Sequence, residues 1–317
     1  MKADPSYDAA YREHAKHVWA IVYRMTGSAQ DADDIVQDTF VRAMARERLP
    51  EGEMRPWLGR IASNAGIDLL RQRRRRGYVG PWLPEPIDTE DDASADASEA
   101  GADAGYDLLE SASFAFLLAL EALQPRPRAV LLLRDVFDYS VREVAGVLDM
   151  SETHVKVTHH RARRMMETYD QERCIPTREL QERTRAVLAS LMASFVTRDT
   201  EAIERLLTES VRSVSDSDGD FFAARVPVVG RPKVSTFWTR TTQYAQKGGV
   251  DIAFRMLNGL PAIVASRSVR REGTAPRTVI MVQLDARGSV VEVRSIVALR
   301  KLARLMAPVD KARAGGR

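Results

Sequence analysis

The chain has 317 residues, of which 44% are hydrophobic and 29% are charged, and its formal net charge is +3. This composition excludes a wholly disordered chain, and the length predicts about two or three domains. No uncharged apolar run reaches the length of about 18 residues that spans a bilayer. Residues 1–5 lack the apolar segment of a secretory signal. We therefore expect a soluble, cytoplasmic protein.

The charge is unevenly distributed along the chain. Residues 71–76 contain five arginines, whereas residues 85–110 contain ten acidic residues and no lysine or arginine. A second basic cluster, 156–164, contains no acid. Basic blocks around an acidic spacer indicate two modules that face polyanions, with solvated surface charge as the alternative. The single cysteine, Cys174, excludes an internal disulfide and a cysteine metal cluster, so we expect no metal and no cofactor.

The first 77 residues have the pattern of a helical bundle. Apolar residues at three- and four-residue spacings predict a helix over 7–25. Ser28 can cap a second helix with an acidic first turn, and residues 50–52 form a loop. A third helix is predicted over 57–76. The arginines at its end point in all directions around the helix, which suits phosphates better than one base pair.

Residues 78–107 are predicted to form a linker. Trp82 and Leu83 stand among prolines at 81, 84 and 86, so a stiff backbone holds large apolar groups outward. We expect this peptide to dock on the C-terminal domain and to set the separation of the two modules. The acidic part that follows contains few bulky residues and is predicted to be disordered.

Residues 108–173 are predicted to be helical again and to contain a helix-turn-helix. Ser140 and Glu143 form a capping box, and Ser151 caps the last, basic helix. The predicted helices are 114–123, 128–137, 141–148 and 154–167, with a break at the Pro-Arg-Pro of 125–127.

After residue 176 the sequence predicts a separate α+β domain over 178–306, followed by a flexible tail over 307–317. Helices are expected at 178–196, 202–207 and 234–246, and alternating apolar residues predict strands at 250–257, 280–284 and 290–297. Asn258-Gly259 is a hairpin turn signal, so we expect an antiparallel sheet.

Two helices carry the chemistry of nucleic-acid recognition. On the basic helix, Lys156 and Arg161 can donate to guanine O6 and N7, and Val157 can contact a thymine methyl group. On the helix over 57–76, Asn64 and Asp68 lie on one face with Arg71, and an asparagine can bond a base edge. The alternative for the basic helix is a surface helix of an all-α bundle.

The chain resembles extracytoplasmic-function (ECF) sigma factors. Residues 31–40 (DADDIVQDTF), 57–64 (WLGRIASN) and 68–71 (DLLR) are similar to sigma region 2, and residues 123–134 and 140–164 are similar to region 4. The peptide over 78–86 (YVGPWLPEP) resembles the linker of a subgroup with a C-terminal SnoaL-like (NTF2-like) domain. The resemblance implies two all-α sigma modules, a region 2 bundle and a region 4 helix-turn-helix, followed by a SnoaL-like α+β domain.

The resemblance also assigns roles to residues. It implies contacts with the β′ clamp helices of core RNA polymerase for Asp31, Asp33, Asp34, Gln37 and Asp38. It implies contacts near the −10 element for Arg42, the loop over 48–54, Asn64, Asp68 and Arg71, and we add the arginines Arg73, Arg74 and Arg75. It implies contacts with the −35 element for Lys156, Val157, Thr158, His160 and Arg161, and we add Ser151 and Thr153. The docking residues of the linker are Trp82, Leu83, Pro84, Glu85 and Pro86.

Three stretches depart from the family pattern. His159 and His160 are unusual on the −35 helix, and residues 218–222 and 298–302 replace motifs of the SnoaL-like subgroup, DGGGK and NPDKL. All five histidines precede residue 161, so the C-terminal domain lacks the side chain best suited to acid–base catalysis. We therefore expect no enzymatic activity.

The sequence predicts a sigma factor that binds core RNA polymerase (β′ clamp helices and β subunit) and promoter DNA, is regulated in cis by its C-terminal domain, and needs no separate anti-sigma factor. Two alternatives stay open. One is a helix-turn-helix regulator that acts without core polymerase, and the other is a SnoaL-like enzyme with a DNA-binding N-terminus.

Overall fold

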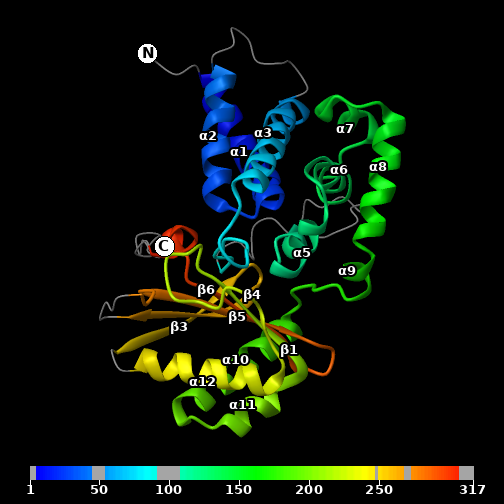
Figure 1. Cartoon of the computed structure of the whole chain (residues 1–317). Coiled ribbons are helices and arrows are strands. Elements are labelled where there is room, and N and C mark those ends of the chain that lie inside the picture. Colours follow the sequence, from blue (N-terminus) through cyan, green and yellow to red (C-terminus); the bar gives the residue numbers. More distant parts are fainter. Residues whose placement is uncertain (1–4, 45–53, 91–107, 247–248, 268–272, 307–317) are drawn as a thin grey trace. The chain divides into compact units, whose positions relative to one another are not determined.

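The computed structural model describes residues 5–44, 54–90, 108–246, 249–267 and 273–306, which fall into two compact units (Figure 1). The first unit comprises residues 1–77, 83–85 and 92–176, and the second comprises 78–82, 86–91 and 177–317. The predicted disordered part of the linker, most of the loop over 48–54 and the predicted tail lie outside the described residues. In the described part of the chain, no helix is long and apolar enough to cross a membrane.

The first unit is all-α. Its helices are α1 (Pro5–Thr26), α2 (Ala29–Met44), α3 (Met54–Arg76), α4 (Leu108–Ser111), α5 (Phe114–Ala119), α6 (Pro125–Asp135), α7 (Val141–Leu148), α8 (Glu152–Met165) and α9 (Glu167–Gln171). The prediction of one helix over 114–123 was wrong, because α5 gives way to a 3-10 turn at Leu120–Ala122. The predicted break at 125–127 was also wrong. These prolines begin α6, where a missing N–H costs no hydrogen bond.

Polar groups at the C-terminal end of α1 join this helix to α6 and α3. The last carbonyl groups of a helix have no partner within it. Here Arg128 Nη1 donates to Met25 O at 2.8 Å, and Arg73 Nη1 donates to Thr26 O at 2.7 Å. Both guanidinium groups also bond Glu121 Oε1, at 2.8 and 3.0 Å. Burial lowers the pKa of Arg128, and the Glu121 carboxylate opposes that shift.

A second polar cluster joins α1 and α3 to the turn before α7. The Tyr139 hydroxyl lies 2.9 Å from His17 Nε2 and donates to Arg55 O at 3.2 Å. Arg55 Nε donates to the same His17 nitrogen at 3.2 Å. Gly59 on α3 makes room for this approach, because a Cβ there would lie 2.6 Å from the Tyr139 hydroxyl. The two helical modules of the first unit therefore meet through hydrogen bonds at the middle and at the C-terminal end of α1.

The second unit is a six-stranded sheet with helices. Its elements are α10 (Arg178–Thr197), α11 (Thr200–Leu206), β1 (Leu207–Asp216), β2 (Val228–Val229), α12 (Arg231–Gln246), β3 (Val250–Leu257), β4 (Leu260–Arg267), β5 (Arg277–Leu284), β6 (Val290–Ile296) and α13 (Leu299–Met306). The strand order is β2-β1-β6-β5-β4-β3. The predicted antiparallel sheet is mixed instead, because β1 and β6 pair in parallel.

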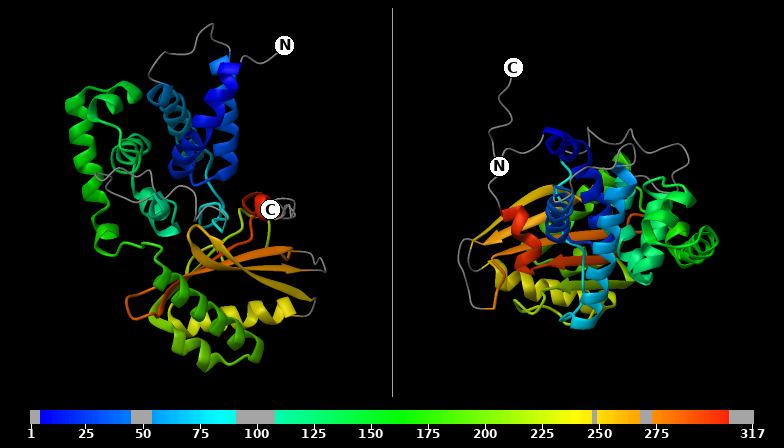
Figure 2. Two further views of the ribbon diagram at one scale, coloured as in Figure 1. Left: turned by 180° about the vertical axis from the view of Figure 1, so that it is seen from behind. Right: turned by 90° about the horizontal axis from the view of Figure 1, so that it is seen from above.

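The core of the second unit lies between the sheet and helices α10 and α12, which cover one of its faces (Figures 1 and 2). Phe195 of α10 stacks on Trp238 of α12, with ring centroids 5.8 Å apart. The Trp238 indole N–H donates to Ser213 of β1 at 3.0 Å. Asn258 and Gly259 have φ angles of 52° and 81°, which confirms the predicted hairpin turn between β3 and β4.

The first unit should lose stability as the pH falls below 6.5. Burial, and then the nearby Arg55 cation, lower the pKa of His17 to about 3 from 6.5. Protonation therefore favours the unfolded chain, so the stabilisation is complete above pH 6.5 and declines toward pH 3. In that window His17 should contribute up to about 1.4 kcal/mol per pH unit.

Chemical denaturation of the full chain between pH 7 and 5 measures this slope. The control variant His17→Gln keeps a hydrogen-bond acceptor but does not titrate, so its stability should depend less on pH. Parallel curves for both proteins would contradict the assignment.

Candidate nucleic-acid and polymerase interface

The helix-turn-helix is formed by α7, a tight turn and α8, as the sequence predicts. Ser140 Oγ accepts from the Glu143 amide, and the Glu143 carboxylate accepts from the Ser140 amide at 2.7 Å. Asp149 ends α7 in the left-handed region, with a φ of 53°. Ser151 Oγ then accepts from the His154 amide and caps α8. These caps fix where α8 begins and therefore which of its residues face solvent.

Helix α8 divides cleanly into two faces. Val155 and Ala162 are fully buried, and α8 packs against α6 and α7. Six of the predicted −35 residues are exposed and one, Thr158, is half-buried; the exposed ones are Ser151, Thr153, Lys156, Val157, His160 and Arg161. Val157 is 44% exposed, so its side chain can reach a thymine methyl group.

The two histidines that depart from the family pattern have different environments. His160 is exposed, whereas His159 is half-buried and its Nε2 lies 2.8 Å from Asp135 Oδ1 of α6. Arg163 lies 3.6 Å from the same carboxylate. His159 and Arg163 therefore orient α8 on α6, and His160 is the histidine that can face DNA.

The predicted −10 residues of α3 differ in whether they also bond other parts of the first unit. Asn64, Asp68, Arg71 and Arg75 are exposed along α3, and Arg71 pairs with Asp68 at 3.1 Å. Arg73, by contrast, binds Thr26 and Glu121, as described above. Arg74 Nη2 donates to Leu123 O at 2.9 Å, and its Nη1 bonds Gln124. Arg73 and Arg74 therefore also bond within the first unit, and their contact with DNA phosphates stays a prediction.

The acidic helix α2 presents a narrow exposed face. Asp34, Gln37 and Asp38 are exposed, and Arg42 follows with a 3.8 Å contact to Asp38. Asp31 and Asp33 are half-buried. Asp33 Oδ1 accepts from the Trp19 indole N–H at 2.9 Å, so it also holds α2 against α1.

One part of the linker peptide belongs to the first unit. Leu83 is 2% exposed, and Glu85 is equally buried. Glu85 Oε2 accepts from the amides of Ala29 and Gln30 at 2.8 and 3.1 Å, and Ser28 Oγ lies 3.3 Å away. A carboxylate there satisfies unpaired amides and complements the positive end of the helix dipole. Ser28 caps α2 as the sequence predicts, because its Oγ accepts from the Asp31 amide at 3.2 Å, and the linker adds a second cap through Glu85.

The flanking parts of the linker belong to the second unit. The Lys301 ammonium lies 4.8 Å from the Tyr78 ring centroid and 4.7 Å from that of Trp82. Asp216 accepts from both Lys301 Nζ at 2.6 Å and the Tyr78 hydroxyl at 2.5 Å. Burial and the Asp216 carboxylate raise the pKa of Tyr78 far above its usual value. Trp82 therefore lies beside a buried ion pair of the α+β domain.

Residues 86–90 continue along the same domain. Ile87 exchanges two hydrogen bonds with Asn258 at the β3–β4 turn, at 2.9 and 3.0 Å. The Thr89 amide donates to Met256 O at 2.9 Å, and Asp88 pairs with Arg255 at 2.6 Å. Pro84 and Pro86 are buried. The docking set thus divides, because Leu83, Pro84 and Glu85 join the first unit while Trp82 and Pro86 join the second.

Sequence reasoning missed several residues that position the site, namely His17, Tyr78, Glu121, Arg128, Asp216 and Lys301. The sequence pattern could have revealed Arg128. Its spacing places it on the same face of α6 as Leu131, Leu132 and Asp135, all of which are buried, so a buried arginine is expected there. In the described part of the chain, no group of three His, Cys, Asp or Glu side chains could hold a metal ion.

Known proteins resemble this chain over both helical modules and beyond. Residues 10–76 match sigma-70 region 2, and residues 113–166 match sigma-70 region 4. The ECF RNA polymerase sigma factor SigJ of Mycobacterium tuberculosis is 32% identical over 224 residues, which cover 70% of this chain and 69% of SigJ. This chain belongs to the ECF sigma factors.

Solved structures extend the comparison. The crystal structure of Mycobacterium tuberculosis SigJ matches with a TM-score of 0.69 and 25% identity, over 93% of this ECF sigma factor and 98% of SigJ. A SnoaL-like protein of unknown function from Burkholderia thailandensis matches with a TM-score of 0.28 and 13% identity, over 36% of this chain and 94% of that protein.

Membership of this family decides between the functions that the sequence left open. Sigma factors bind core RNA polymerase and promoter DNA and are not enzymes. A helix-turn-helix regulator that acts without polymerase and a SnoaL-like enzyme are therefore both excluded. The predicted fold class is confirmed as well, with two all-α sigma modules followed by an α+β domain.

Proposed function

We propose that this ECF sigma factor reads the −35 element with α8 and the −10 element with α3, and that its α+β domain regulates it in cis through the linker peptide. The observation that carries the regulatory part is the alternation of the linker between the two units, with Glu85 on α2 and Trp82 beside Lys301. No separate anti-sigma factor is needed in this proposal.

The exposed face of α8 supports major-groove reading. A groove admits one helix, whose N-terminal half meets base edges. Lys156 and Arg161 supply donors for guanine, Val157 supplies an apolar surface, and the buried Val155 keeps the opposite face on the protein. The Ser151 hydroxyl already accepts the His154 amide, so its contribution to DNA binding is its remaining O–H donor.

The exposed face of α3 supports contact with the −10 element. Asn64 offers both a donor and an acceptor for a base edge. Arg71 and Arg75 lie further along the same exposed helix and suit phosphates. In this proposal Arg73 and Arg74 act indirectly, because their contacts to the end of α1 and to the start of α6 hold the C-terminal part of α3 in place.

The α2 helix supports binding to the β′ clamp helices. Asp34, Gln37 and Asp38 form its exposed acidic face, which suits a basic partner surface. Glu85 holds the N-terminal end of the same helix. The linker therefore contacts the helix that we propose binds polymerase. Through this linker, a change in the α+β domain can alter how that helix is held.

Selection from a randomised promoter library by holoenzyme tests the DNA-reading part. Lys156→Ala should change base preference in the −35 element alone, by about 1–3 kcal/mol at one position if the contact is bidentate. Asn64→Ala should change preference in the −10 element alone. The control Arg142→Ala removes an exposed arginine from α7 and should leave the profile unchanged. Variants that each alter both elements would refute the assignment of separate modules.

The linker is tested by Trp82→Ala in the full chain. Loss of the indole removes a cation–π contact to Lys301, which is worth about 0.5–2 kcal/mol, and should loosen the linker from the α+β domain. We expect a larger radius of gyration in small-angle scattering and a changed yield of run-off transcription with core polymerase.

The control for this experiment is Val79→Ala, which truncates a linker residue that is 50% exposed. It should match the wild type in both measurements. If Trp82→Ala also matches the wild type in both, the linker is a passive tether and the regulatory proposal is wrong.

A further inference from the structure

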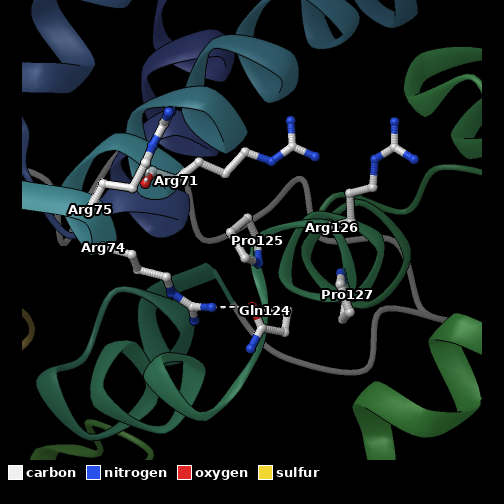
Figure 3. Close-up of a pocket in the computed structure, with 7 residues that line it drawn as sticks. All are labelled: Arg71, Arg74, Arg75, Gln124, Pro125, Arg126 and Pro127. Carbon is white, nitrogen blue, oxygen red and sulfur yellow. Dashed lines mark hydrogen bonds between the residues drawn. The ribbon is translucent and has the colours of Figure 1, made fainter.

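A pocket rich in arginine lies where the end of α3 meets the start of α6, inside the first unit. Its volume is about 580 Å³, within the range of about 300–1,000 Å³ that small-molecule sites occupy. Figure 3 shows the α3 arginines on one side and Arg126 on the other. The residues that line the pocket are Arg71, Arg74, Arg75, Gln124, Pro125, Arg126 and Pro127.

The lining is strongly cationic and partly fixed in position. None of its residues is acidic. Arg74 is held by the Leu123 carbonyl and the Gln124 side chain, and Arg71 by Asp68 on the next turn of α3. Arg126 is exposed in the first turn of α6, where the helix dipole adds positive potential. The pocket therefore offers an anion several guanidinium groups at once.

The chemistry of this pocket selects phosphate groups. Guanidinium groups bind phosphate through paired N–H donors, and arginines from two sides can bind different phosphates of one chain. Pro125 and Pro127 add an apolar wall beside them. We propose that this pocket binds a short phosphate chain, either free or carried by a nucleoside.

A short phosphate chain fits better than a DNA strand for a reason of geometry. The proposed −10 residues all belong to the first sigma module, whereas this pocket also uses Arg126 from the other sigma module. A bound phosphate chain would join α3 to α6 and would occupy Arg71 and Arg75. It would thereby hold the two sigma modules together and withdraw two arginines from promoter binding.

Isothermal titration of the full chain with tripolyphosphate tests this site directly. Arg126→Ala should weaken binding about tenfold, because it removes a charge-assisted contact. The control Arg142→Ala removes an exposed arginine of α7 and should leave the affinity unchanged. Arg126 is outside the proposed promoter-binding set and no DNA is present, so the outcome is independent of the proposed function.

Two further ligands identify the source of the phosphate chain. ATP that binds more tightly than tripolyphosphate indicates that the pocket takes a nucleoside polyphosphate, and equal affinities indicate that it recognises the phosphate chain itself. Sulfate at the same ionic strength should bind far more weakly than either. Equal affinity for sulfate and tripolyphosphate, or full affinity in Arg126→Ala, would overturn the proposal.

Discussion

Two carbonyl oxygens at the C-terminal end of α1 need hydrogen-bond donors, and the contacts between the two sigma modules follow from how they obtain them. Arg128 of α6 and Arg73 of α3 supply the donors, and the Glu121 carboxylate pairs with both guanidinium groups. A buried guanidinium without a counterion would be strongly destabilising, so all three side chains must meet at one place. This meeting fixes the end of α3 beside the start of α6, and the arginine pocket is formed there.

The linker supplies hydrogen-bond acceptors to the N-terminal end of α2, where the unpaired groups are amides and the partner is therefore an anion. The first amides of α2 lack partners within the helix, and the Glu85 carboxylate accepts from two of them. Trp82, three residues before Glu85, lies beside Lys301. One short peptide therefore contacts both the α+β domain and the helix that we propose binds polymerase. Loosening the peptide from one unit would change how it is held at the other.

Whether a structural feature could be predicted from the sequence depends on how far apart its interacting residues lie along the chain. The caps at Ser140 and Ser151 are local, so the sequence predicts the helix-turn-helix and the exposed face of α8. The contacts of Arg73 and Arg74 within the first unit depend on carbonyl groups about fifty residues away in the chain, which no local pattern reveals. Composition alone therefore does not show that these two arginines also hold α3 in place.

The second unit shows the same limit. Alternation predicts β3, β5 and β6, and Asn258-Gly259 predicts the hairpin. Strand β1 was missed because its buried positions include Ser213 and Asp216, whose partners lie on α12 and α13. The remaining strands predict an antiparallel sheet, and the parallel pairing of β1 with β6 was therefore not predicted. A strand is missed when its buried positions are polar and their hydrogen-bond partners lie far away in the sequence.

The two sigma modules are held together by a coupled network in which Glu121 pairs with Arg73 of the other module as well as with Arg128. A double-mutant cycle of Arg73→Met and Glu121→Gln, read out by amide hydrogen exchange of α6 in the full chain, measures the coupling across the modules. The account predicts that each single change lowers protection and that the double change costs at least about 1 kcal/mol less than the sum. Additive effects would show that the two side chains act independently and would contradict the account.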